Sequence, residues 1–167
     1  LPAIAQAYIK DKWGRGVSDS VMQELGQPTF LPTQSYPDQV LTQMAELAGS
    51  KTGVSVRDFF LGFGRATVKA FHKNYRTYFK DESLKAFYLR MNELHAQLTK
   101  DQPGIKPPTF TYEDKGDVLF MNYRSKRGLF DYFEGILNGA AEFKGEKVKV
   151  AVKPLDAETA RAEIRFL

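Results

Sequence analysis

Three polar side chains at alternating positions are the first residues that could bind a ligand. Tyr123, Ser125 and Arg127 lie in the segment 121–133, MNYRSKRGLFDYF. Side chains alternate between the two faces of a β-strand, so a strand here would point all three the same way. Two hydroxyls and a guanidinium on one face are suited to binding carboxylates or phosphates.

The surroundings of this polar strand leave its role open. Polar residues on the wet side of a strand are common, so the short pattern also fits a solvated face. Leu119 and Met121 share the predicted face, however, which indicates a partly buried site. A buried arginine needs an anionic partner. Asp131 and Glu134 could serve, and a bound ligand that carries carboxylates could serve equally well.

A histidine offers a second kind of chemistry. The chain has 2 histidines, and His95 falls on the apolar face of a predicted helix, between Met91 and Leu98. It is either a core histidine with a hydrogen-bonding partner, the commoner case for a single residue, or an axial metal ligand. Neutral imidazole is the commonest metal ligand, and one histidine suffices for haem because the porphyrin supplies the equatorial donors. Zinc would need further protein ligands, which the residues near His95 do not provide.

Composition removes several classes of protein. The 167 residues include no cysteine, which excludes disulfides, thiolate catalysis and cysteine-based metal sites. The net charge of +4 is spread along the chain, so we expect no nucleic-acid binding. The sequence shows no apolar run as long as a membrane span, so we expect no membrane insertion. We also expect no enzyme, because no nucleophile–base pair, glycine-rich phosphate loop or Ser-His-Asp arrangement stands out.

The spacing of apolar residues predicts the fold class. Helical periodicity continues to about residue 99, and a period of two, typical of strands, follows residue 108. The predicted elements are helices over 1–13, 17–25, 37–47, 55–79 and 83–99, a turn over 49–53, strands over 109–112, 117–125, 147–152 and 160–166, and an inserted helix over 129–143. The sequence therefore predicts one α+β domain over 1–167, in which a helical N-terminal part and an antiparallel sheet with an inserted helix share one core.

The histidine and the polar strand together resemble a known family. A helix that carries His95, then Pro108, then a strand with Tyr-x-Ser-x-Arg at 123–127, is similar to the H-NOX family of haem nitric oxide/oxygen binding domains. These domains are found in bacterial gas sensors and in the sensory part of soluble guanylate cyclase. The resemblance covers essentially the whole chain, and the combination is far more specific than either part.

The resemblance implies that the chain holds haem b between its helical part and its sheet. His95 would be the proximal iron ligand. Tyr123, Ser125 and Arg127 would hold the haem propionates, which are the anionic partner that the arginine needs. Pro108 would press on the porphyrin and distort it from planarity. The other haem contacts that the resemblance implies are Met91 near the proximal face, Phe71, Phe133 and Ile136 lining the pocket, and Leu1 on the distal helix.

The resemblance also bears on which gas would bind. In H-NOX domains that bind oxygen stably, a distal tyrosine follows an aspartate, as Tyr132 follows Asp131 here. A charge-assisted hydrogen bond from the phenol to dioxygen would contribute roughly 1.5–3 kcal/mol. The Trp and Asn that orient this tyrosine are replaced by Ala5 and Thr67. We therefore expect oxygen binding with a less restrained tyrosine; the alternative is that Tyr132 turns into the core.

The predicted function is that of a bacterial, cytoplasmic gas-sensor domain. It would bind O2, NO and CO at ferrous haem and relay a conformational change to an effector. The effector would be a histidine kinase, a cyclic-dinucleotide enzyme or a chemotaxis receptor, separate or fused. One alternative is a protein-interaction or apolar-ligand-binding domain of the same fold. Another is a haem enzyme, which the lack of a distal histidine–arginine pair disfavours.

Overall fold

The structure is a computed structural model that describes the whole chain except residues 27–29, 32–35, 75, 77–78, 80 and 101–105. The helices are α1 (Pro2–Trp13), α2 (Arg15–Leu25), α3 (Gln39–Thr52), α4 (Val56–Asn74), α5 (Leu84–Leu89), α6 (Met91–Thr99) and α7 (Phe130–Lys144), and the strands are β1 (Thr109–Asp114), β2 (Val118–Arg124), β3 (Val148–Pro154) and β4 (Thr159–Phe166). Within the described part of the chain, each helix is too short or too polar to cross a membrane.

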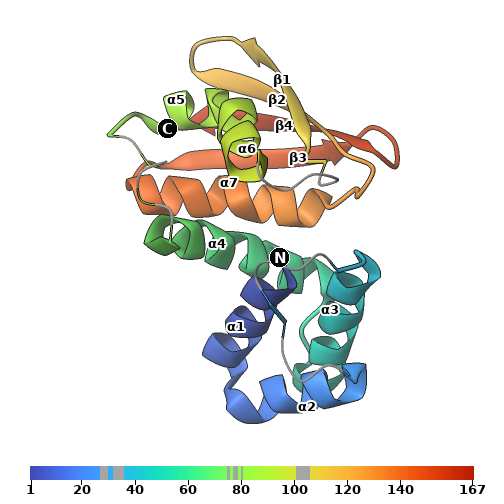
Figure 1. The fold of residues 1–167 in the computed structure, drawn as a ribbon. Coiled ribbons are helices and arrows are strands. Elements are labelled where there is room, and N and C mark those ends of the chain that lie inside the picture. Colours follow the sequence, from blue (N-terminus) through green and yellow to red (C-terminus); the bar gives the residue numbers. More distant parts are fainter. Residues whose placement is uncertain (27–29, 32–35, 75, 77–78, 80, 101–105) are drawn as a thin grey trace.

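The elements form two parts that meet along a pair of helices. Helices α1 and α3 pack on one side of α4, α2 packs against α1 and α3, and α4 lies against α7 (Figure 1). Helix α7 covers one face of a 4-stranded antiparallel sheet with the order β1-β2-β4-β3. This arrangement confirms the predicted α+β class, with α7 as the helix inserted between the two hairpins.

The prediction of one shared core is wrong, because the buried side chains form two clusters. The helical cluster gathers side chains of α1 to α4, and the sheet cluster lies between α5, α6, α7 and the sheet. Neighbouring residues of α7 divide between them: Tyr132 belongs to the helical cluster and Phe133 to the sheet cluster. Ile136 packs against both clusters. Helices α4 and α7 therefore form a boundary between two cores.

Several predicted element boundaries are also wrong. The helix predicted over 55–79 ends, as α4, at Asn74; Phe79 lies outside any helix, and residues 75 and 77–78 are not among those that the structure describes. The turn predicted over 49–53 is helical as far as Thr52, and Gly53 ends α3 with φ 83°. Gly49 lets the chain after this end return close to the helix: a Cβ there would lie 2.7 Å from the Val54 carbonyl oxygen. The helix predicted over 83–99 is divided at Arg90 (φ −100°, ψ 5°) into α5 and α6. The Tyr112 hydroxyl donates to the Tyr88 carbonyl beside this break.

Glycines allow α4 and α7 to touch through their backbones. A Cβ on Gly135 would lie 2.3 Å from the Leu61 carbonyl oxygen, and one on Gly64 would lie 2.5 Å from the Tyr132 carbonyl oxygen. Both distances are far below normal van der Waals contact, so no side chain larger than hydrogen fits at either position. The joint between the two parts thus depends on residues that carry no side chain.

Helices α1 and α4 make a similar close contact inside the helical part. The Tyr8 ring packs edge-on against Phe59, with 5.5 Å between the ring centroids. A Cβ on Gly62 would lie 2.0 Å from the Tyr8 hydroxyl oxygen. This hydroxyl is buried and has no hydrogen-bond partner among the described residues. An unsatisfied buried hydroxyl typically costs about 1–3 kcal/mol of stability.

Replacing Gly135 by Ala should lower the free energy of unfolding by about 1–3 kcal/mol or more, because the new methyl group meets helix backbone that cannot turn aside. Gly16→Ala is the matched control, since a Cβ at Gly16 in α2 meets nothing within 4 Å. That control should leave stability unchanged or raise it by up to about 1 kcal/mol. Urea unfolding of both variants measures the difference, and equal effects would refute the tight contact.

Candidate functional site

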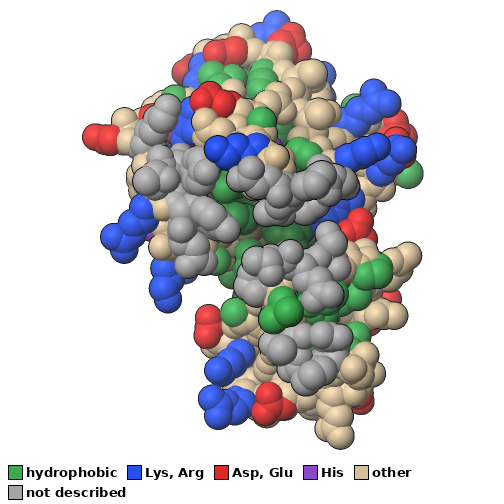
Figure 2. All heavy atoms as spheres, viewed as in Figure 1, with side chains coloured by type: hydrophobic (Ala, Val, Ile, Leu, Met, Phe, Trp, Pro, Cys, Tyr) green, Lys and Arg blue, Asp and Glu red, His purple; other side chains and the backbone are tan. Residues whose placement is uncertain are grey.

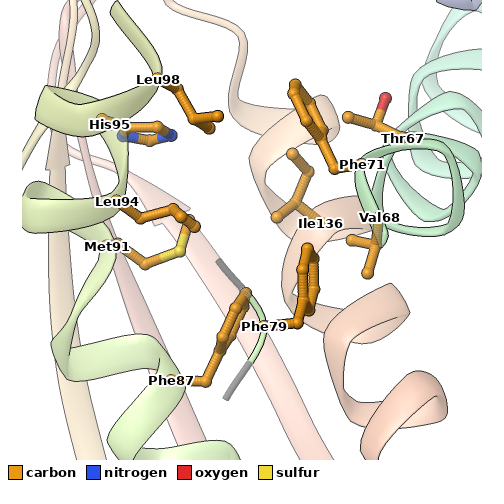
Figure 3. A pocket seen from close by; sticks show the side chains of 10 residues that line it. All are labelled: Thr67, Val68, Phe71, Phe79, Phe87, Met91, Leu94, His95, Leu98 and Ile136. Atoms are coloured by element: carbon orange, nitrogen blue, oxygen red, sulfur yellow. The ribbon is translucent and has the colours of Figure 1, made fainter. Parts of the chain in front are cut away.

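An apolar cavity lies between α6 on one side and α4 and α7 on the other (Figure 3). It encloses about 490 Å³ of empty space when the open solvent at its mouth is included. Its lining consists of Thr67, Val68, Phe71, Phe79, Phe87, Met91, Leu94, His95, Leu98 and Ile136. Figure 2 shows hydrophobic side chains in the hollow between the two parts of the molecule.

His95 is the nitrogen-bearing side chain in this apolar wall. Figure 3 shows its imidazole beside Leu98, on the opposite side of the cavity from Phe71. The Nδ1 atom is buried and has no hydrogen-bond partner in the part of the chain that the structure describes. Burial lowers the pKa of His95 to about 4, so the imidazole is neutral at pH 7. An unpartnered Nδ1 does not match the core-histidine interpretation, and a neutral imidazole is the form that binds metals.

The polar strand ends in a charged contact with the helical part. Strand β2 ends at Arg124, so the prediction that one strand carries Tyr123, Ser125 and Arg127 on the same face is wrong beyond Tyr123. Tyr123 and Ser125 are buried, and Arg127, in the turn that follows, is half-buried. The Ser125 hydroxyl accepts a hydrogen bond of 3.2 Å from the Arg127 backbone N–H. The guanidinium of Arg127 donates to Asp38 at the start of α3, with Nε at 2.9 Å and Nη2 at 2.8 Å from Oδ1. These residues lie outside the cavity lining.

The acids predicted as partners of the arginine pair elsewhere. Asp131 and Glu134 both bind Arg57 of α4, with 2.8 Å between Arg57 Nη2 and Glu134 Oε2. Glu134 lies one helical turn after Asp131, so both carboxylates project from α7 toward the start of α4. The suggestion that either acid binds Arg127 is therefore wrong. Asp38 takes that place, although it is distant in the sequence.

Tyr132 points into the helical core, where its hydroxyl meets Thr67. The phenol donates to Thr67 Oγ1 at 3.0 Å, and Thr67 Oγ1 donates to the Phe63 carbonyl oxygen at 2.9 Å. The Tyr132 and Phe63 rings lie 4.7 Å apart. Burial raises the pKa of Tyr132, so the phenol keeps its proton. Thr67 lines the cavity and Tyr132 does not, so the phenol reaches the cavity wall through a hydrogen bond to Thr67.

The cavity brings together only some of the predicted residues. Met91, Phe71, Ile136 and Thr67 share it with His95. Among the others, Phe133 packs in the sheet cluster, Leu1 packs against the helical cluster and Pro108 directly precedes β1.

Sequence reasoning missed five of the lining residues as members of a site. They are Val68, Phe79, Phe87, Leu94 and Leu98. Leu94, Leu98 and Phe87 continue the helical spacing of His95, so the apolar stripe could have identified them.

The residues around the cavity are not suited to binding a metal ion without a cofactor. Among the described residues, no group of three histidine or acidic side chains gathers to hold a metal. A neutral imidazole beside an apolar cavity matches a cofactor that brings its own equatorial donors, which a porphyrin does. The hydroxyls and guanidinium at the end of β2 suit the carboxylates that haem carries.

Comparison with known proteins identifies the family. The model of the Haem-NO-binding family matches residues 1–152, so the chain belongs to this family. Proteins of this family are haem-binding sensor domains and not enzymes. The resemblance predicted from the histidine and the polar strand is thereby confirmed. No curated protein sequence matches the chain.

Solved H-NOX structures share the fold over nearly the whole chain. A Cs H-NOX mutant carrying 4-cyano-L-phenylalanine is 27% identical, with a TM-score of 0.88, over 98% of this chain and 92% of that one. A mutant of the T. tengcongensis H-NOX is 27% identical, with a TM-score of 0.87, over 99% and 97%. An oxygen-binding H-NOX domain related to soluble guanylate cyclases, in its oxygen complex, is 26% identical, with a TM-score of 0.86, over 99% and 95%.

The low pKa of His95 makes the stability of the cofactor-free chain depend on pH. The pKa falls from 6.5 to about 4 on folding, so the unfolded chain binds more protons between these values. Lowering the pH through this window should reduce the free energy of unfolding, by on the order of 3 kcal/mol at most. His95→Gln should remove this part of the slope in urea titrations. Identical slopes in the two proteins would contradict it.

Proposed function

We propose that the chain is a haem-based gas-sensor domain that binds O2, NO and CO, with His95 as the axial ligand of haem b. The observation that carries the proposal is the buried, neutral imidazole of His95 in the wall of an apolar cavity. Haem, when bound, supplies an iron with an open position for a diatomic gas. Residues 1–167 would form one cytoplasmic domain that signals to a histidine kinase, a cyclic-dinucleotide enzyme or a chemotaxis receptor.

The remaining side chains divide the work of holding the cofactor. Met91, Phe71 and Ile136 would contact its apolar faces, since they share the cavity with His95. Phe133, Pro108 and Leu1 are proposed as further contacts on the strength of the family resemblance.

Arg127, with Tyr123 and Ser125, would bind the propionates. Its contact with Asp38 uses Nε and Nη2, and a guanidinium carries further donors on Nη1. Arg127 is therefore able to bind a carboxylate without releasing Asp38. In this arrangement it would connect the cofactor to α3 of the helical part as well as to the end of β2.

Tyr132 would set the preference for oxygen, and Thr67 would oppose it. The single hydroxyl hydrogen of Thr67 is donated to Phe63, so Thr67 can only accept from Tyr132. The phenol hydrogen is thus held by Thr67 and must leave it before it can be donated to oxygen. Dioxygen gains more from such a donor than nitric oxide, because bound dioxygen carries more negative charge. We propose that this domain binds oxygen more weakly than its tyrosine alone would allow.

Replacing His95 by Gly should abolish haem retention, and added imidazole should restore it, because a free imidazole can fill the space of the lost side chain. The measurement is the Soret absorbance of protein expressed with a supply of haem. His72→Gly is the control: His72 packs against Phe143 and against the lining residue Phe79 but does not itself line the cavity, so haem retention should persist. A wild-type protein without a Soret band, or unchanged retention in His95→Gly, would overturn the proposal.

Replacing Thr67 by Val should raise oxygen affinity about five- to tenfold, because a neutral hydrogen bond of about 1 kcal/mol no longer competes for the Tyr132 hydrogen. Oxygen titration of the ferrous protein measures this change, and nitric oxide affinity should stay the same. Tyr132→Phe should lower oxygen affinity, and in that background Thr67→Val should have no effect. A fall in oxygen affinity in Thr67→Val would mean that Thr67 orients the tyrosine instead.

A further inference from the structure

We infer that Asn92 is a positioning residue that orients the His95 imidazole through the ring of Phe110. Asn92 lies on α6 one turn before His95, and Phe110 lies on β1. The inference rests on the proposed role of His95 as the axial ligand. The contacts between Asn92 and Phe110 are independent of that role.

Asn92 connects α6, the helix that carries His95, to the edge of the sheet by two hydrogen bonds. Among the strands of the described residues, β1 lies at the edge of the sheet and pairs with β2. The Phe110 backbone N–H donates to Asn92 Oδ1 at 2.9 Å, and Asn92 Nδ2 donates to the Phe110 carbonyl oxygen at 2.8 Å. One carboxamide thus satisfies both backbone groups that Phe110 presents away from β2. Because both bonds come from one rigid side chain, they define how α6 starts against β1.

Tyr112 makes a second attachment at the same place. Its hydroxyl donates to the carbonyl oxygen of Tyr88, beside the break between α5 and α6. The Met91 backbone also hydrogen-bonds to this hydroxyl. Strand β1 therefore holds the first turn of α6 through two side chains, one from each element. The helix break at Arg90 leaves peptide groups for Tyr112 to bind.

Phe110 in turn contacts the imidazole. The two rings stack with 5.6 Å between centroids and 30° between planes. The Phe110 ring is also held by Phe133, at 5.8 Å, and by Tyr123, at 5.9 Å. Asn92 holds the backbone of this ring against the helix that carries His95, so the imidazole and its stacking partner move together.

Because His95 Nδ1 has no hydrogen-bond partner among the described residues, stacking on Phe110 is important for the orientation of the imidazole. A metal-ligating histidine normally donates its other ring N–H to a carboxylate or carbonyl, which sets the orientation of the ring. In the part of the chain that the structure describes, His95 Nδ1 has no such partner. The orientation of the imidazole must therefore come from packing, and the Phe110 ring held by Asn92 is a flat surface stacked against it.

The test compares Asn92→Leu with Asn122→Leu in the full chain. Asn122 also bonds to β1, through Nδ2 to Thr111 Oγ1 at 3.2 Å, but on an exposed site away from His95. Asn92→Leu should accelerate hydrogen exchange of the Phe110 amide about tenfold, as expected for one lost hydrogen bond. In the ferrous protein it should also shift and broaden the iron–histidine stretching band in resonance Raman spectra. Asn122→Leu should change neither.

Two further variants separate orientation from general stability. Asn92→Asp keeps the acceptor for the Phe110 N–H and loses the donor to its carbonyl, so it should fold and give an intermediate Raman shift. Phe110→Leu should shift the band as Asn92→Leu does, and the double variant should shift it no further. A loss of stability in Asn92→Leu with an unchanged band, or additive shifts in the double variant, would overturn the inference.

If the protein does not bind haem, the proposed function is refuted, but the positioning role of Asn92 can still be tested without the cofactor. The contact between the His95 and Phe110 rings is then measured by nuclear Overhauser effects between their protons. Asn92→Leu should weaken these effects and Asn122→Leu should preserve them. Equal effects in the two variants would refute the positioning role.

Discussion

The backbone contact between α4 and α7 is the constraint on which the rest of the structure depends. Gly64 and Gly135 let the two helices approach until their peptide groups touch. At this distance, Tyr132 reaches Thr67 across the contact, and Ile136 packs against both cores. The same pair of helices forms one wall of the cavity. A wider separation of α4 and α7 would therefore alter the hydrogen bond of the phenol, the shape of the cavity and the packing between the two parts at the same time.

The chemistry of the polar groups around the cavity depends on their protonation states and on their hydrogen-bond partners. Burial keeps the His95 imidazole neutral and the Tyr132 phenol protonated. The imidazole has an unused nitrogen in the described structure, whereas the phenol already has an acceptor in Thr67. In an apolar environment such differences have large effects, because a polar group cannot exchange its partner for water. The proposed gas selectivity thus depends on a competition between two acceptors for one hydrogen.

The sequence predicts those features of the molecule that depend on local, periodic patterns of residues. The apolar spacing locates the helices and places His95 on an apolar face, and alternation puts Tyr123 on the buried side of β2. The break at Arg90 is invisible because the apolar stripe continues across it. The pairing of Arg127 with Asp38 joins positions 89 residues apart, and no local pattern indicates it. The reciprocal hydrogen bonds of Asn92 are hidden for the same reason, since they require knowing which strand is at the edge.

The contact between Tyr8 and Gly62 has a consequence for how this sequence can change. A hydroxyl that finds no partner among the described residues costs stability, yet it stands where a side chain at position 62 would otherwise be. As long as the tyrosine remains, glycine is the residue that fits opposite it. Loss of the hydroxyl alone would still leave a ring carbon 2.9 Å from such a Cβ, so position 62 opens to alanine only when the side chain at position 8 becomes smaller or moves. The two positions are therefore expected to vary together among relatives, with the change in α1 coming first.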